Sequence, residues 1–185
     1  VIDAPGYEDA EQPLASHPRL DLFMSPSSPH PMGKFGCTVC HEGAAETLDF
    51  TRAVHMPSNE EEKHEWEEKY HWHRYHYWDW PMLPSQYTEA GCYSCHAMSG
   101  TLETIAEDAP KLTKGLQLME DYGCYSCHNI QGWRVDRKSG PSLRNIKDKV
   151  DEEWARSWIA NPHHFRESTR MPQIFHLENR VSEEW

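Results

Sequence analysis

The sequence has no apolar run long enough to cross a bilayer, and apolar residues are scarce throughout. Hydrophobic residues make up 37% of the 185 positions, and the mean hydropathy is −0.86. A membrane helix needs about 20 consecutive apolar residues, so no transmembrane span is predicted. The low apolar content also predicts a thin protein core, and something other than side chains must then supply apolar surface.

Basic residues are scarce relative to acidic ones. Eighteen Lys and Arg face 30 Asp and Glu, which gives a formal net charge of −12. Such a chain repels phosphate backbones, so we expect no nucleic-acid partner. The acidic surface fits a basic docking partner or a solvated face with no particular partner.

Long uninterrupted segments are also missing, because 13 Pro and 10 Gly divide the chain. This predicts a mainly α fold with much irregular coil. Short helices are expected over about 58–70, 111–122 and 151–160. Ser58 and Glu61 form a capping-box pattern for the first helix, and Asp151 is a good N-cap for the last. We expect residues 1–36 to be extended coil over the functional units, with a disordered tail as the alternative.

No cysteine lies outside three repeats of one pattern, Cys-x-x-Cys-His. The repeats are Cys37–His41, Cys92–His96 and Cys124–His128. At the histidine content of this chain, chance would place His after all three pairs in roughly 3 of 10,000 cases. The pattern is therefore a chemical signature rather than an accident of composition.

The spacing matches the chemistry of covalent haem. Two thiols three positions apart can form thioethers with the vinyl groups of one haem, and the following His then ligates the iron. Short helices would then pack around the haems. We therefore predict three c-type haems, attached at Cys37 and Cys40, at Cys92 and Cys95, and at Cys124 and Cys127, with iron ligands His41, His96 and His128.

Three other uses of paired cysteines fit less well. Zinc ribbons combine two pairs, so a third pair would be left over. A thioredoxin-like redox pair would not occur three times without βαβ patterning. A disulfide framework would not explain the three histidines.

We expect a dihaem region over residues 1–108 and a monohaem domain over 109–185. Covalent haem is attached outside the cytoplasm, which predicts the periplasm or the extracellular side of a membrane. No signal peptide is recognised, so membrane association is expected only through partners or an anchor outside this sequence. The dense aromatic segment 70–80 suggests a haem pocket wall, with a protein contact patch as the alternative.

Residues 111–175 resemble a class I cytochrome c in their order of features. A helix, the motif at 124–128, Gly140-Pro141, a second helix and Met171-Pro172 follow one another as in that family. The resemblance implies that the Pro141 carbonyl accepts a hydrogen bond from His128 and that Met171 is the distal iron ligand. Segments 30–37, 80–84 and 166–172 also resemble large multihaem cytochromes of planctomycete-type bacteria, which implies electron transfer.

The other two haems need their own distal ligands, which the spare histidines and methionines could supply. The candidate distal ligands of these two haems are His17, His30, His55, His71, His73, His76 and Met82. We expect His55 to close the first haem, His30 to reach a neighbouring haem, and His71, His76 or Met82 to close the second. A surface or packing role is the alternative for each of them. At least one bis-His haem is therefore predicted.

These features predict a triheme electron-transfer protein rather than an enzyme. It would pass electrons between redox protein partners, as a subunit of a larger respiratory or multihaem assembly. The alternative is a haem enzyme, a peroxidase or small-oxyanion reductase, with one open-coordinate haem. A haem-based sensor is a third class, but no output domain is present.

Overall fold

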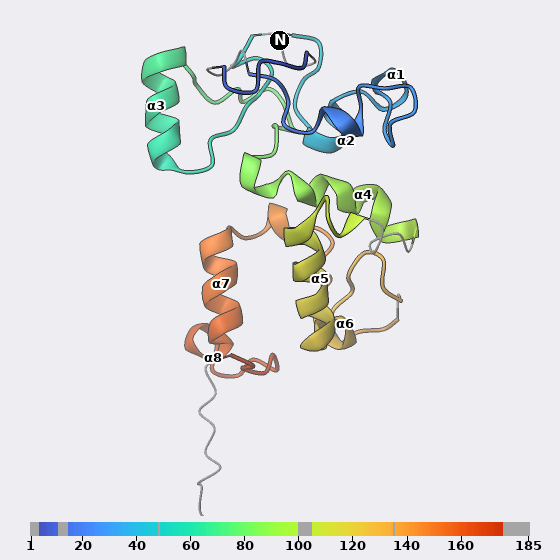
Figure 1. Ribbon diagram of the computed structural model, residues 1–185. Helices are drawn as coiled ribbons and strands as arrows, with labels where there is room; N and C mark the ends of the chain where they lie inside the picture. Colours follow the sequence, from blue (N-terminus) through green and yellow to red (C-terminus); the bar gives the residue numbers. More distant parts are fainter. Residues whose placement is uncertain (1–3, 11–14, 48, 100–104, 135, 176–185) are drawn as a thin grey trace, which may run out of the picture. The chain divides into compact units, whose positions relative to one another are not determined.

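The structure is a computed structural model that describes residues 4–10, 15–47, 49–99, 105–134 and 136–175. Short helices joined by turns and coil make up these residues, and no strand occurs among them (Figure 1). The chain divides into two compact units, residues 1–94 and 95–185. The expected mainly α fold with much coil is confirmed, whereas packing around haems stays a prediction.

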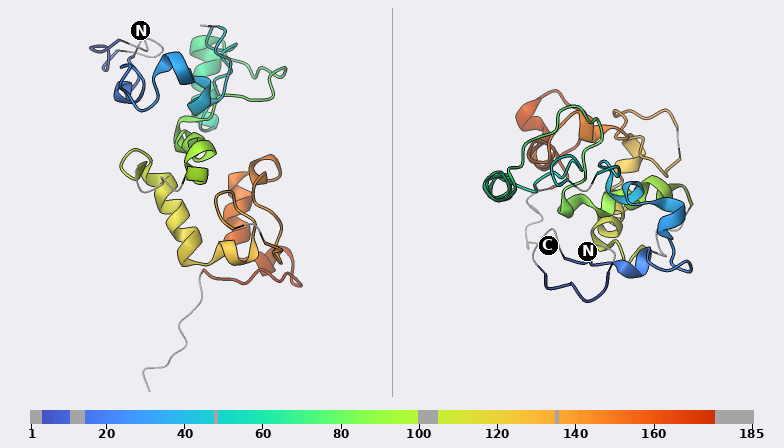
Figure 2. Two further views of the ribbon diagram at one scale, coloured as in Figure 1. Left: turned by 90° about the vertical axis from the view of Figure 1, so that its right-hand side faces the viewer. Right: turned by 90° about the horizontal axis from the view of Figure 1, so that it is seen from above.

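The first unit is mostly loop, as both views of Figure 2 show. Its residues 15–36 are rich in turns rather than extended, and residues 1–3 and 11–14 lie outside the described part. Its helices are η1 (Leu20–Leu22), α1 (Met32–Phe35), α2 (Thr38–His41), α3 (Glu60–Tyr70), η2 (Ser85–Tyr87) and the first half of α4 (Glu89–Ser99).

The predicted helix near 58–70 is present as α3, but its cap differs by one residue. The Asn59 side chain accepts a hydrogen bond from the Glu62 amide at 2.9 Å, and the Ser58 amide donates to Glu62 Oε2 at 2.5 Å. The capping box predicted from Ser58 and Glu61 is therefore wrong in register. Asn is as good an N-cap as Ser, and the shift moves the capped amide from Glu61 to Glu62.

Backbone hydrogen bonds tie the loop after α2 to two later segments. The Gly43 amide donates to Trp80 O at 2.9 Å, and the Leu83 amide donates to His41 O at 2.8 Å. The Met82 amide donates to Val54 O at 2.9 Å, and Val54 is only 2% exposed. The first Cys-x-x-Cys-His motif thus lies against the buried centre of its unit.

The described residues of the second unit contain the following helices. They are the second half of α4, α5 (Pro110–Asp121), α6 (Cys124–Cys127), η4 (Ile146–Asp148), α7 (Glu152–Ala160) and α8 (Pro162–Phe165). The predicted helices near 111–122 and 151–160 are confirmed. Pro110 begins α5, where its missing N–H costs nothing, and Asp151 caps α7 by accepting from the Trp154 amide at 2.7 Å.

The division between the units falls inside α4, which carries the second motif. The predicted division into a dihaem region over residues 1–108 and a monohaem domain over 109–185 stays a prediction. Within the described residues no helix is both long and apolar enough to cross a bilayer.

The buried apolar residues of the described chain are few and mostly small. Half of them are alanines, and the others are Val54, Trp72, Ile105, Leu116 and Ile130. Many large side chains are exposed instead, including Trp80 at 61% and Phe165 at 48%. Such a core is thin for two folded units, as the composition indicates.

Candidate functional site

Each of the three motifs forms a helical turn. The first lies at α2, the second in α4 and the third at α6. Residues three apart share one face of a helix, so both sulfurs of a pair point to the same side. All six sulfurs are thiols, with Cys37, Cys95 and Cys127 exposed and the other three half-buried.

The third motif shows how its histidine is oriented. His128 Nδ1 donates to the Pro141 carbonyl at 2.7 Å, and the Gly140 amide donates to Cys127 O at 2.8 Å. The contact implied by the cytochrome resemblance is therefore present. Because Nδ1 holds the ring proton, Nε2 is left as the nitrogen available to a metal, as in most histidine–metal sites.

Gly140 lies so close to His128 that no side chain fits between them. A Cβ on Gly140 would lie 2.7 Å from His128 Cε1 and 3.0 Å from Cys127 O. The glycine therefore permits the flat approach that brings the Pro141 carbonyl to the imidazole. The role of Pro141 beside a haem stays a prediction.

Met171, the predicted distal ligand of the third haem, is half-buried in the loop after α8. Trp158 Nε1 donates to its sulfur at 2.9 Å. Trp158 also stacks on Trp154, with ring centroids 5.3 Å apart. The sulfur is thus held at the aromatic face of α7, and a thioether sulfur has a second lone pair for a metal.

The first motif brings two histidines together. His41 Nε2 lies 3.4 Å from His17 Nε2, and the ring centroids are 5.6 Å apart. Burial lowers the pKa of His41, and the nearby His17 and His55 lower it further. Burial also lowers the pKa of His17. Both rings are thus favoured as neutral imidazoles, the form that binds metals.

His55, expected to close the first haem, is held by other groups. Its Nδ1 donates to Phe50 O at 2.8 Å, and its ring stacks on Phe50 with centroids 4.2 Å apart. Burial lowers the pKa of His55 as well. Trp72 Nε1 donates to the His55 carbonyl at 2.8 Å. His55 thus has an oriented ring, and its ligation of iron stays a prediction.

The remaining predicted distal ligands lie in different surroundings. His30 packs edge-on against Phe35, with ring centroids 5.3 Å apart. The Met82 side chain lies against Gly43, two residues after His41, and so beside the first motif. His76 is exposed. The structure thus places Met82 near the first motif, although the sequence assigns it to the second.

Neighbouring motifs approach each other through glycines. A Cβ on Gly91, which precedes the second motif, would overlap the Cys40 carbonyl of the first. A Cβ on Gly132, shortly after the third motif, would lie 2.6 Å from the carbonyl of Ala97, which follows His96. Sequence reasoning gave no role to either glycine, because a lone Gly predicts a turn rather than a contact.

The donor set fits covalent haem. Paired thiols, neutral imidazoles and a thioether are the ligand types that c-type haem uses. Thr113 Oγ1 in α5 and Asn129 Oδ1 beside His128 are buried without a hydrogen-bond partner among the described residues. Such atoms normally have one, so they mark places where a polar group of a cofactor would fit.

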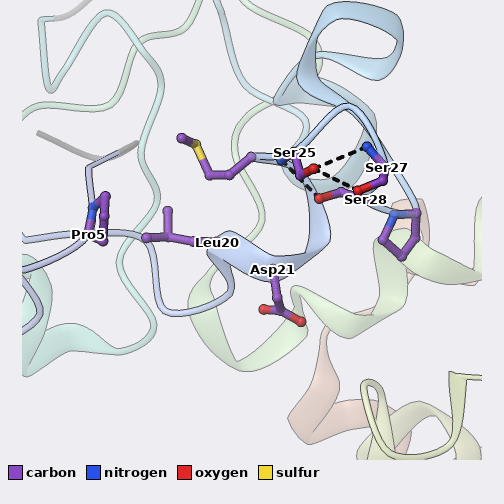
Figure 3. A pocket seen from close by; sticks show the side chains of 8 residues that line it. Pro5, Leu20, Asp21, Ser25, Ser27 and Ser28 are labelled. Carbon is purple, nitrogen blue, oxygen red and sulfur yellow. Dashed lines mark hydrogen bonds between the residues drawn. The ribbon is translucent and has the colours of Figure 1, made fainter.

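Elsewhere in the first unit, a hollow of about 500 Å³ lies close to the N-terminal segment. Figure 3 shows that Ser25, Ser27 and Ser28 hydrogen-bond to one another at its rim, with Ser25 Oγ 2.8 Å from Ser27 Oγ. Its lining contains no Cys or His, so it is not a site for these haems. The lining residues are Pro5, Leu20, Asp21, Met24, Ser25, Ser27, Ser28 and Pro29.

Comparisons of the chain with protein-family models, with curated proteins and with solved structures find no match. The motifs and their geometry are therefore what indicates a function for this chain.

Proposed function

We propose that this chain is a triheme c-type cytochrome that transfers electrons on the outer side of a membrane. The observation that carries the proposal is the triple Cys-x-x-Cys-His motif, which uses every cysteine of the chain. Bound haem supplies one-electron chemistry between ferric and ferrous iron. The chain's own residues attach it, ligate it and set its potential.

The contacts between motifs support transfer along the chain. The Gly91–Cys40 approach brings the second motif to the first, and the Ala97–Gly132 approach brings the third motif's segment to the second. Such backbone contacts favour short separations between neighbouring haems. A thioether at Met171 would give the third haem a higher potential than a bis-His haem, so electrons would run from the N-terminal haems toward it.

The experiment is haem counting on protein made with the cytochrome c maturation machinery. A pyridine haemochrome assay is expected to find three covalent haems per chain. Fewer than three would contradict the proposal.

Carbon monoxide separates electron transfer from the alternative of a haem enzyme. Six-coordinate haems resist carbon monoxide, so the reduced protein is expected to show no fast binding. Rapid binding of one equivalent would instead favour a peroxidase or a small-oxyanion reductase. We further propose that the partners are redox proteins, including other subunits of an assembly, since a −12 chain offers a surface for basic docking partners.

A further inference from the structure

We infer that His17 is the second axial ligand of the first haem, opposite His41. The inference rests on the proposed function, because it needs a haem attached at Cys37 and Cys40. It assigns a residue that the sequence left in a pool of candidates, behind His55 and His30.

The two imidazoles face each other nitrogen to nitrogen. Their Nε2 atoms are 3.4 Å apart, and their centroids are 5.6 Å apart. When two imidazoles meet head-on, the centroid distance exceeds the Nε2–Nε2 distance by the two centroid-to-nitrogen distances. The two distances measured here differ by about that amount. A side-by-side or stacked pair would have centroids much closer together. Each Nε2 atom therefore points toward the other ring.

The spacing is close to that of two ligands on one metal. A metal–imidazole bond is about 2.0–2.1 Å, so nitrogens on opposite sides of one ion lie about 4 Å apart. The pair, now 3.4 Å apart, needs to open by about 0.6–0.8 Å to admit iron. It is also already aligned along the axis that iron requires.

Neighbouring residues hold His17 in this position. Ser16 is buried, and its amide donates to Tyr7 O at 3.0 Å while its hydroxyl accepts from the Tyr7 amide at 3.2 Å. Phe23 packs edge-on against the His17 ring, with centroids 5.0 Å apart. Ligands of this kind need a supported ring, and His17 has support on its backbone and on its side chain.

Iron binding has one consequence at the other nitrogen of His17. The Arg19 amide donates to His17 Nδ1 at 3.0 Å, so in this arrangement the ring proton is on Nε2. Ligation through Nε2 would require that proton to move to Nδ1, and the Arg19 amide would then lose this acceptor. Two iron–nitrogen bonds would take the place of the contact between the imidazoles.

The other candidate ligands of the first haem are not shown with a ligating atom directed at His41. The His55 ring lies flat on Phe50, with an interplanar angle of 9°. His30 packs on Phe35, and Met82 on Gly43. His17 is the candidate whose ligating atom is shown facing His41.

The test uses the full haem-loaded chain and the variant His17→Ala, with His55→Ala and His30→Ala as matched controls. In His17→Ala we expect one of three ferric haems to become high-spin by EPR, and the reduced protein to bind one equivalent of carbon monoxide. Added imidazole should restore the low-spin signal. Both controls should keep the haem of the first motif low-spin.

Two measurements keep the inference testable if His17→Ala does not fold. Near-infrared magnetic circular dichroism of the unmodified protein should show at least one His/His haem, and its absence overturns the inference. His17→Met should convert one His/His haem to His/Met and raise its potential. An unchanged spectrum in both His17 variants also overturns it, and so does an open haem in His55→Ala when His17→Ala opens none. A haem count below three would instead count against the proposed function.

Discussion

At the scale of single residues, the orientation of the histidine in the third motif depends on the absence of a side chain at Gly140. His128 keeps its hydrogen bond to Pro141 only because no Cβ stands between the segment 140–141 and the imidazole. Pro141 and Met171 were predicted through a family resemblance. The closeness of Gly140 to the ring was not predicted, because sequence does not reveal a through-space distance.

Gly140→Ala is expected to destabilise the second unit. The new methyl group would meet His128 Cε1 at 2.7 Å, and overpacking of this kind costs about 1–3 kcal/mol. Thermal denaturation of the haem-loaded protein should therefore show a lower melting temperature. Gly115→Ala in α5 is the matched control, because nothing lies within 4 Å of its added Cβ. There Ala should raise helix stability by up to about 1 kcal/mol, and equal destabilisation by both changes would contradict this account.

At the scale of elements, helices with strong end signals were predictable and those made by tertiary contacts were not. α7 begins after Asp151 as its cap predicts, and α5 begins at Pro110. α4 was missed, because Gly91 and two cysteines lie within it. Cap register was also ambiguous at α3, where Ser58 and Asn59 both resemble an N-cap. Which of two adjacent capping residues begins the helix is decided by the local backbone geometry.

Asp151→Ala should shorten or fray α7. The carboxylate that accepts from the Trp154 amide at 2.7 Å is lost, and loss of an N-cap costs about 1 kcal/mol. α7 also carries Trp158, so the indole contact to Met171 should weaken. Circular dichroism melts would measure the effect. Asp151→Asn keeps the cap oxygen and should behave nearly as the unmodified chain; a loss as large as that of Asp151→Ala would refute the capping role.

At the scale of the whole molecule, the arrangement of the motifs could be predicted only in part. The 32 residues between the second and third Cys pairs suggest that these haems are near each other. The approach of Gly132 to Ala97 agrees with that. The longer gap between the first and second pairs gave no such indication, yet Gly91 lies against Cys40. The composition predicts how little apolar surface is buried, but not which residues form the core.

Gly91→Ala is expected to push the first and second motifs apart. Backbone cannot yield as a flexible side chain does, so the clash with the Cys40 carbonyl should cost about 1–3 kcal/mol. A lower melting temperature and slower electron exchange between the first two haems should follow, measured by denaturation and by stopped-flow reduction. Gly33→Ala in α1, where nothing lies within 4 Å, is the control. No difference between the two variants would argue against the contact.

The thin protein core predicts that the chain needs its haems to fold. Protein made without haem attachment should melt without a sharp transition and exchange its amide hydrogens quickly, because most buried side chains are alanines or lie near the motifs. Hydrogen-exchange mass spectrometry of haem-loaded and haem-free chains would test this. Equal protection in both forms would mean that side chains alone supply the core.

The most direct test of the central claim is the intact mass of the purified chain after extraction with acid and an organic solvent. That treatment removes non-covalent haem and leaves thioether-linked haem in place. We expect a mass equal to the chain plus three haems, all lost together when the six cysteines are replaced by serine. A mass equal to the bare chain, with its cysteines as thiols or as disulfides, would contradict it.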